Sequence, residues 1–368
     1  MIWLYATLLL PSLFWLIGVV RWLGAKRKGS QAEQTQSIAV VVVARNEERT
    51  ISDCLISICE QCIGPQEVIL MDDSSDDQSP EIVRNLAKKY GKLRMVTFTS
   101  KAGRSPKKTG LALAFANIDT ELVALTDADC VVPNKWLESM AKYSDSKIGA
   151  VIGASWPSND KGILSRIYRW ERLIANVSMA SACGWGSPAS ACGHNILYRR
   201  EALNVVEAPV RRDLTSGDDD LTVQAIARAG FRVVFCPDSE SVVHDLGGVR
   251  GSRWSQAVRH QSVTKLYPLH WQVVFLMSVV SGVVVPASLV ALPAFGQILI
   301  PVSFAAAKIL LDTFSGIFVK RKLKLDISNL EILLASLLLP FWMIWRALAS
   351  IFGKSYSWRD RKIAATGR

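Results

Sequence analysis

The sequence predicts an α/β domain built on a mostly parallel sheet and joined to helices that cross a membrane. Short apolar runs without in–out alternation recur between residues 38 and 125 and alternate with helical stretches, as expected for strands buried on both faces of a sheet. Longer apolar segments lie at residues 1–23 and again after residue 270, and they are long enough to cross a hydrocarbon layer of about 30 Å. The composition, 50% hydrophobic and 20% charged, suits this combination.

The first apolar segment, residues 1–23, is expected to be a retained membrane anchor. Its only charged residue is Arg21, and three basic residues follow at 26–28. A cleavable signal peptide carries its positive charge before the apolar run, not after it. Basic residues next to a membrane segment prefer the cytoplasm. We therefore expect a polar linker at 24–36 and the α/β domain on the cytoplasmic side of the cell (inner) membrane.

Three further apolar stretches follow that domain, at residues 271–295, 297–319 and 330–352. One basic cluster lies between the second and the third, and another follows the third. Three full spans would put these clusters on opposite sides of the membrane, although both favour the cytoplasm. We therefore expect the third stretch to be re-entrant or interfacial and broken near Pro340. The membrane region at 263–352 would then lead into a basic cytoplasmic tail at 353–368.

The net charge of +11 indicates a membrane surface as partner and no nucleic acid. A nucleic-acid binder gathers basic residues with aromatic ones on one surface, whereas here many basic residues flank apolar segments, where anionic headgroups attract them. The seven cysteines form no paired framework, and Cys59 and Cys62 lack a second pair at zinc spacing. Reduced cytosolic thiols are expected.

The α/β region is expected to span residues 37–262. Four strands are predicted at 38–43, 67–71, 94–98 and 122–125, and three helices at 47–60, 80–90 and 107–117. In such sheets ligands bind beyond the carboxyl ends of the strands. Acidic and polar residues follow the first, second and fourth strands, at 44–48, 72–77 and 126–129. Carboxylates gathered at one edge need a cation or hydrogen-bond donors to offset their repulsion.

Asp127 and Asp129 follow the fourth strand and predict a metal site. Two carboxylates spaced i, i+2 at a strand end can both reach a hard cation that also touches diphosphate oxygens, and Mg²⁺ or Mn²⁺ suits such oxygen ligands. That ion would neutralise charge on a departing nucleoside diphosphate. A solvated turn is the alternative, because Asp is common in turns. The position after a buried strand favours the metal site.

Two further motifs follow strands or enter helices. Lys107 and Lys108 lie in a basic loop at the start of a helix, where phosphate binds; an exposed loop is the alternative. Asp72 and Asp73 come too early to cap the helix beginning near Pro80, although the later acids there suit a cap. Either of these two acids could accept a hydrogen bond from a base or ribose.

Asp218, Asp219 and Asp220 precede an amphipathic segment at 222–229. Three carboxylates before a helix fit a cap and complement the positive end of the helix dipole. They also fit a catalytic base placed against the metal site. Helix-start signals alone favour the cap, and both roles stay open.

Taken in order, these motifs resemble the family 2 glycosyltransferases. The matching segments are residues 44–47, 72–76, 107–108, 127–129, 193–195, 217–221 and 253–254, and the resemblance covers residues 37 to about 262. Each motif is weak alone, but seven in this order with family-like spacing are specific. The resemblance implies the GT-A fold, inverting sugar transfer and a divalent cation, Mg²⁺ or Mn²⁺.

The resemblance also assigns roles to individual residues. The donor side would comprise Ala44, Asn46, Glu47, Asp72, Asp73, Lys107, Lys108 and Asp127, with Asp127 and Asp129 at the metal. The acceptor side would comprise Gly193, His194, Asn195, Asp220, Arg253 and Trp254. The acid triplet matches the motif that supplies the general base. If 220–221 aligns with the family's acid-Leu ending, the base is Asp218, and a shift of one residue makes it Asp219.

One departure from the family pattern bears on the product. Processive polysaccharide synthases of this family carry Gln-x-x-Arg-Trp before their membrane helices, whereas here Arg250 replaces the Gln ahead of Arg253 and Trp254. Trp254 could stack on a sugar or nucleotide, or the segment could be an interfacial helix. The lost Gln and the few C-terminal segments argue against a polymer-extruding channel.

The expected function is therefore transfer of a sugar from a nucleotide-sugar, first a UDP-sugar, to a lipid or lipid-linked saccharide at the membrane. Three alternatives remain: a processive polysaccharide synthase, an inactive membrane scaffold of the same fold, and a nucleotidyltransferase. Intact acidic residues at all three sites weigh against the scaffold. A nucleotidyltransferase would not need the segment around Asp218.

Overall fold

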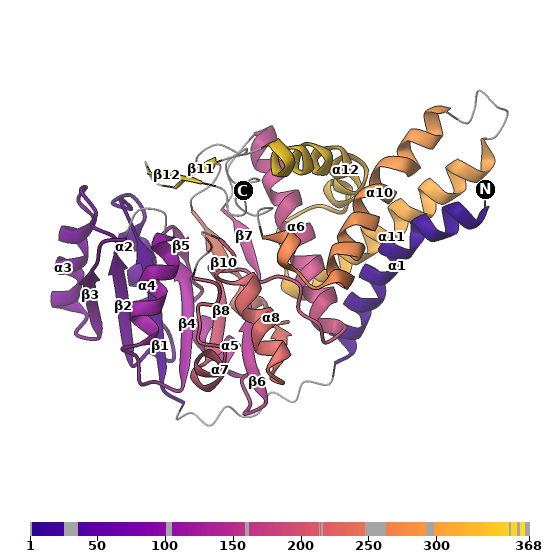
Figure 1. Ribbon diagram of the computed structural model, residues 1–368. Helices are drawn as coiled ribbons and strands as arrows, with labels where there is room; N and C mark the ends of the chain where they lie inside the picture. The colour runs from indigo at the N-terminus through magenta and orange to yellow at the C-terminus, as the bar shows by residue number, and fades with distance from the viewer. Residues whose placement is uncertain are drawn as a thin grey trace.

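A computed structural model gives the three-dimensional structure of the chain (Figure 1). It describes residues 2–25, 36–100, 105–158, 162–212, 214, 216–246, 263–291, 298–352, 355–358 and 361–364. The α/β domain lies at one end of the molecule, and long helices extend from it toward the other end (Figure 1).

The domain is built on a seven-stranded sheet in the order β3-β2-β1-β4-β8-β6-β9. Only β8 runs antiparallel to its neighbours. The strands are β1 (Ile38–Ala44), β2 (Glu67–Asp72), β3 (Leu93–Thr97), β4 (Leu122–Asp127), β6 (Ile148–Ile152), β8 (Ile196–Arg199) and β9 (Arg232–Phe235). The four strands predicted from apolar runs are confirmed, with ends shifted by a residue or two.

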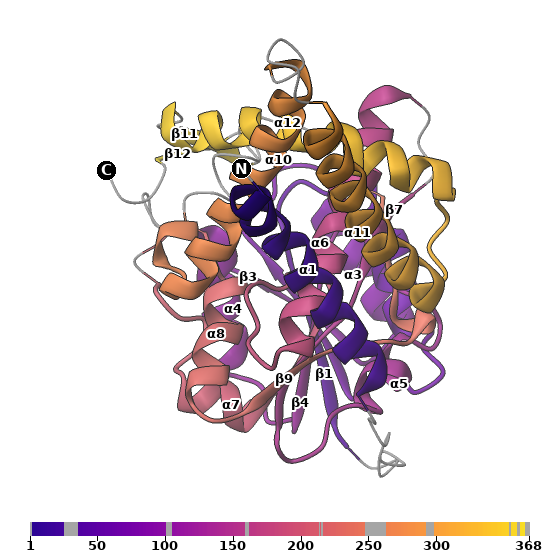
Figure 2. The same ribbon diagram turned by 90° about the vertical axis from the view of Figure 1, so that its right-hand side faces the viewer.

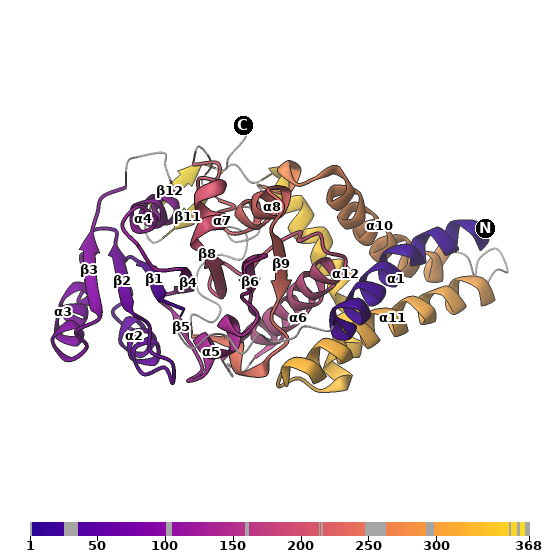
Figure 3. The same ribbon diagram turned by 90° about the horizontal axis from the view of Figure 1, so that it is seen from below.

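Helices cover both faces of this sheet, as seen from below in Figure 3. One face carries α2 (Ile51–Cys59), α3 (Ser79–Lys89) and α5 (Trp136–Ala141), and the other carries α4 (Pro106–Phe115), α7 (Arg200–Val205) and α8 (Asp220–Arg228). Successive residues of β1 alternate between the two hydrophobic clusters so formed. Burial on both sides explains why the strand reads as an uninterrupted apolar run.

The register of β1 brings two acid-bearing strand ends together. Ala44 pairs with Asp72 on one side, and Val43 pairs with Asp127 on the other. A second, three-stranded sheet of β5 (Cys130–Val131), β10 (Val243–Asp245) and β7 (Ser155–Pro157) lies beyond this edge. In it Asp245 pairs with Cys130, so a further carboxylate joins the same edge.

Three described helices are long and apolar enough to cross a membrane: Ile2–Gly24, Leu269–Leu289 and Leu299–Leu323. They belong to α1 (Ile2–Gly24), α10 (Leu269–Ala291) and α11 (Leu299–Leu323), which lie side by side in Figures 1 and 3. A long helix, α6 (Ile163–Gly184), joins this bundle to the domain.

The last apolar stretch forms α12 (Asn329–Phe352), which lies across α10 and α11 (Figure 2). The expected break near Pro340 is wrong, because the helix continues through that residue. Its first part, Asn329–Leu338, is a shorter apolar helix than the three candidate spans. Two strands, β11 (Ser355–Trp358) and β12 (Arg361–Ala364), pair within the segment that we expected to be a plain tail.

The hydrophobic core of the domain continues into the helices on its membrane side. Val19 and Trp22 of α1, and Val319 and Leu323 of α11, belong to the cluster that packs under the sheet. The indole Nε1 of Trp22 donates to the Phe235 carbonyl at 2.9 Å. The composition changes at residues 24–36 and 262 therefore do not mark the edges of separate cores.

Candidate active site

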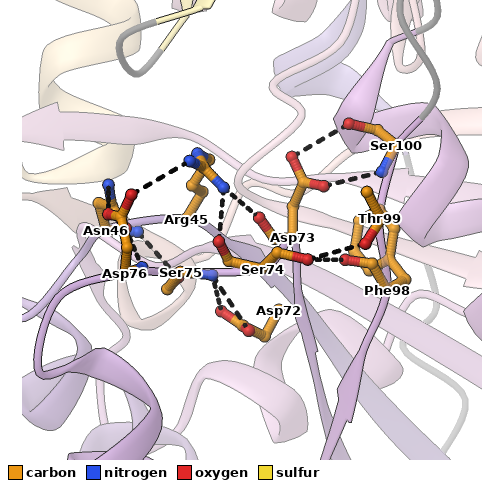
Figure 4. Close-up of polar contacts among 10 residues, drawn as sticks. All are labelled: Arg45, Asn46, Asp72, Asp73, Ser74, Ser75, Asp76, Phe98, Thr99 and Ser100. Atoms are coloured by element: carbon orange, nitrogen blue, oxygen red, sulfur yellow. Dashed lines mark hydrogen bonds and ion pairs between the residues drawn. The ribbon is translucent and has the colours of Figure 1, made fainter.

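The loops after β1 and β2 close on each other through side-chain contacts (Figure 4). The guanidinium of Arg45 donates to the carbonyls of Asp73 and Ser74, each at 2.6 Å. Asn46, which has a left-handed φ of 54°, exchanges hydrogen bonds with Asp76 at 2.7 and 3.0 Å. These contacts hold the two predicted donor-side loops in one rigid arrangement.

Asp72 and Asp73 lie buried under this arrangement. The Asp73 carboxylate accepts from the backbone N–H of Ser100 at 3.0 Å and from its hydroxyl at 3.2 Å, and Asp72 accepts from the N–H of Ser75 at 3.3 Å (Figure 4). Asp73 is 0% exposed. In the described chain, both carboxylates therefore organise the β2 and β3 loops.

The remaining donor-side residues of these loops are also buried. Ala44 ends β1, and its carbonyl accepts from the Asp73 N–H at 3.0 Å. The Glu47 N–H donates to the Ser79 hydroxyl at 2.8 Å, and its carboxylate accepts from Thr50. The predicted helix starts later than expected, at Ile51, because Glu47 to Thr50 form a turn.

Lys107 contacts both Asp127 at the end of β4 and the acid triplet at residues 218–220. Its ammonium lies 2.8 Å from Asp127 Oδ1 and 3.6 Å from Asp218 Oδ2. Burial lowers the pKa of Lys107, but Asp127, Asp218 and Asp219 outweigh it and raise that pKa above its ordinary range. Three carboxyl groups from β4 and the start of α8 therefore surround one fixed positive charge.

Lys108 points away from this group. Its side chain is 2% exposed, and its ammonium donates to the carbonyls of Val210 and Arg211 at 3.3 and 3.0 Å. Lys108 thus ties α4 to the loop that leads to the acid triplet. Of the two lysines that the motif offered, Lys107 is the one at the candidate site.

The three acids at the start of α8 have different surroundings. Asp219 caps the helix, because its Oδ1 accepts from the Asp220 N–H at 2.8 Å. Asp220 accepts from the Ala191 N–H at 2.9 Å and from the Tyr267 hydroxyl. Burial, then the neighbouring acid, raises the pKa of both Asp219 and Asp220. Asp218 instead faces Lys107, so the cap of α8 is Asp219 and not Asp218.

Gly193 and His194 complete this side of the site. A Cβ atom at Gly193 would lie 2.7 Å from Asp219 Oδ2 and 3.3 Å from Lys107 Nζ, so the close approach requires glycine. His194 Nδ1 is 3.8 Å from Asp127 Oδ2, and its Nε2 is 3.2 Å from Cys192 Sγ. Burial lowers the pKa of His194, but Cys192 and Asp127 raise it to about 9.

Asn195 does not face the site. It is 0% exposed, and its amide donates to the carbonyls of Ala154 and Ser241 and accepts from Trp136 Nε1 at 2.8 Å. It joins β8 to neighbouring segments as a framework residue. Its amide is engaged inside the protein in this structure, and its assignment to the acceptor side stays a prediction.

Asp245, which the sequence analysis did not identify, lies beside Asp129. Ligand atoms of Asp129, Cys130 and Asp245 all lie within 4.8 Å of one another. Burial, Asp127 and Asp245 raise the pKa of Asp129 to about 6. The crowded carboxylates fit a hard divalent cation, which would offset their repulsion. Burial also raises the pKa of the Cys130 thiol, so oxygen atoms are the better ligands.

Asp245 is itself fixed by a second layer of contacts. It accepts a hydrogen bond from the Tyr168 hydroxyl, and Arg172 donates to that hydroxyl at 2.8 Å. Such outer contacts orient carboxylate ligands. Asp245 follows the short apolar run at 242–243 by two residues and ends β10, and an acid at a strand end was the signal available for it. Arg253 and Trp254 lie outside the described residues.

Comparison with known proteins agrees with this geometry. A model of the family described as "Glycosyltransferase like family 2" matches residues 35–271. β-Monoglucosyldiacylglycerol synthase of Trichormus variabilis is 32% identical over 117 residues, which are 31% of this chain and 25% of that protein. Poly-β-1,6-N-acetyl-D-glucosamine synthase of Staphylococcus epidermidis is 24% identical over 230 residues, 59% of this chain and 52% of that protein. The chain thus spans between a quarter and about half of these relatives.

Among solved structures, the mannosyltransferase PcManGT from Pyrobaculum calidifontis, in complex with GDP-Man and Mn²⁺, has a TM-score of 0.62 and 21% identity. The match covers 94% of this chain and 95% of that one, and so includes the membrane-side helices as well as the GT-A domain. The described sheet, the acid-bearing strand ends and the family model agree: this chain belongs to the family 2 glycosyltransferases and has the GT-A fold.

Proposed function

We propose that this protein transfers a sugar from a nucleotide-sugar to a lipid or lipid-linked acceptor at the membrane, with inversion at the anomeric carbon. The observation that carries the proposal is the position of Lys107 between Asp127 and Asp218, at 2.8 and 3.6 Å. This lysine connects the turn that would hold the donor diphosphate to the acid that would activate the acceptor. A nucleotide-sugar bound at the Asp127 turn and an acceptor bound at Asp218 would therefore lie next to each other.

In the proposed reaction, Asp218 accepts the proton of the acceptor hydroxyl while that oxygen attacks the anomeric carbon. The bond from this carbon to the diphosphate breaks, and the nucleoside diphosphate leaves with the electron pair. Attack on the face opposite the diphosphate inverts the configuration. Lys107, at the start of α4, holds positive charge close to the departing phosphates.

Asp127, Asp129 and Asp245 would hold Mg²⁺ or Mn²⁺. A divalent cation bound there supplies charge neutralisation to the leaving diphosphate. The carboxylates of these three residues are the hard oxygen ligands that such ions prefer, and the Tyr168 contact keeps Asp245 directed toward Asp129. The effect of metal removal on sugar transfer tests this metal assignment.

Asp218 is the better candidate for the base within the triplet. Asp219 is engaged as the cap of α8, and Asp220 accepts two hydrogen bonds. Asp218 pairs with Lys107 at 3.6 Å, and 16% of its side chain remains exposed. A base must lie within hydrogen-bond reach of the hydroxyl that it deprotonates.

The membrane acceptor is proposed from the helices that continue the domain core. Three described helices have the length and composition to cross a membrane, and α1 and α11 share the core of the catalytic domain. An active site built onto such helices stays close to lipids. A UDP-sugar is the first donor to test, with GDP-mannose beside it because PcManGT was solved with that donor.

The proposal is tested by replacing Asp218 with Ala in membranes that contain the full chain. Transfer should fall by about 10²- to 10⁴-fold, the usual contribution of a general base, while expression and membrane insertion stay normal. Asp119→Ala is the matched control, because Asp119 is an exposed acid paired with Arg200 at the opposite end of the sheet. Near-normal transfer by Asp218→Ala would refute the assignment of the base.

A processive polysaccharide synthase is the second candidate, and the similarity to the poly-N-acetylglucosamine synthase favours it. Product length separates the two functions. A single added sugar excludes the synthase, whereas a ladder of products supports it.

A further inference from the structure

The carboxylate of Asp220 is held from two directions by segments that lie far apart in the sequence. The backbone N–H of Ala191 donates to Oδ1 at 2.9 Å, and the hydroxyl of Tyr267 donates to Oδ2. Ala191 lies two residues before Gly193, and Tyr267 lies two residues before α10. The start of α8 is thereby fixed both to the site segment and to the first C-terminal membrane helix.

Tyr267 is itself locked in place by apolar packing. It is 6% exposed and belongs to a cluster with Leu221 of α8 and Trp271 of α10. Trp271 stacks on Trp15 of α1, with ring centroids 5.9 Å apart and planes at 14°. The position of the Tyr267 hydroxyl is therefore set by the helices of the membrane side.

We propose that Tyr267 is a positioning residue for catalysis that acts through Asp220 on Asp218. This inference rests on the proposed function. Asp218 and Asp220 share one turn, whose backbone is closed by the Thr222 hydroxyl donating to the Asp218 carbonyl at 2.6 Å. A buried carboxylate oxygen that loses its donor is unfavourable, so the turn relaxes when the hydroxyl is removed. Small displacements of a catalytic group reduce the rate strongly.

Tyr267→Phe tests this inference, because it removes one oxygen and keeps the ring. With the donor that the unaltered enzyme uses, kcat should fall about tenfold while the donor KM stays within twofold. Tyr90→Phe is the matched control, since Tyr90 also donates to a carboxylate, that of Glu60, on the exposed side of α3. It should leave both constants unchanged. An unchanged kcat in Tyr267→Phe overturns the inference.

A double-mutant cycle shows whether Tyr267 acts through Asp220. Asp220→Ala should lower kcat at least as much as Tyr267→Phe, and adding Tyr267→Phe to it should lower kcat by less than twofold more. If the losses of kcat from the two single substitutions multiply in full in the double variant, the inference is overturned. A normal kcat in Asp220→Ala also overturns it, and this result holds even if Tyr267→Phe does not fold. If the unaltered protein transfers no sugar from any donor, it is the proposed function that fails.

Discussion

At the scale of single residues, the site combines several acids with the half-buried ammonium of Lys107. Lys107 is surrounded by Asp127, Asp218 and Asp219, and its chain neighbour Lys108 is bonded to loop carbonyls. The two lysines are adjacent in sequence, yet their environments predict opposite consequences when each is replaced.

Lys107→Met should lower transfer by about 10²-fold or more, because the charge that would stabilise the leaving diphosphate is lost. Lys108→Met should instead lower the melting temperature, because the two carbonyls it serves lose their donor inside the protein. Steady-state kinetics and thermal unfolding in detergent separate the two variants. Equal losses of activity without any loss of stability would contradict these assignments.

The sequence reveals which residues follow strands, but it does not reveal which of these residues are in contact in the folded protein. Asp72, Asp127 and Asp129 were recognisable because each ends or follows an apolar run, and parallel strands place such ends at one edge. Asp245 and Tyr267 were not recognised. Their roles depend on contacts with Asp129 and Asp220, more than 40 residues away along the chain.

At the scale of helices and strands, local patterns predicted the elements well and their packing less well. The first four strands and the helices between them follow from apolar runs and turns. The continuity of α12 through Pro340 does not follow from sequence, because Pro interrupts most helices but is tolerated in some membrane-associated ones.

The contact between α1 and α6 is unusually close. A Cβ atom at Gly184 would lie 2.0 Å from the Gly18 carbonyl oxygen, and one at Gly18 would lie 2.0 Å from Ser181 Oγ. Only glycine lets the two backbones approach in this way. The helix α1 is therefore packed tightly against α6, which contacts the sheet of the GT-A domain.

Gly184→Ala should force the two helices apart and destabilise the protein by about 2 kcal/mol, a typical cost of overpacking. The apparent melting temperature of the protein in detergent reports this change. Gly24→Ala serves as control, because a Cβ atom there meets nothing within 4 Å. A Gly184→Ala variant as stable as the control would show that α1 does not pack on α6 in this way.

At the scale of the whole molecule, the candidate membrane helices, the GT-A domain and the Asp129–Asp245 carboxylate cluster form one connected structure. The core under the sheet includes residues of α1, α11 and α12, and Tyr267 links α10 to the acid triplet. The resemblance to a known family predicted the family and the GT-A fold correctly. The shared core could not be predicted, because composition separates membrane segments from soluble ones but does not report their contacts.

Removal of divalent cations should abolish transfer, because the carboxylates of Asp129 and Asp245 would then lack the charge that pairs with the diphosphate. Dialysis against EDTA followed by titration with Mn²⁺ or Mg²⁺ measures the effect. Asp245→Asn should raise the cation concentration for half-maximal activity by about tenfold or more. Full activity in EDTA, or an unchanged titration curve in Asp245→Asn, would contradict a metal site at this cluster.

We propose that Asp218 and the Asp127 turn serve one sugar-transfer reaction at a membrane. The most direct test of this proposal is to incubate membranes containing the protein with UDP-, GDP- and dTDP-sugars, Mn²⁺ or Mg²⁺ and lipid extract, and to identify products by mass spectrometry. We predict one lipid or lipid-linked product whose mass increases by a single sugar and which is absent with Asp218→Ala. A product that persists with Asp218→Ala, or no product with any donor, would contradict the claim.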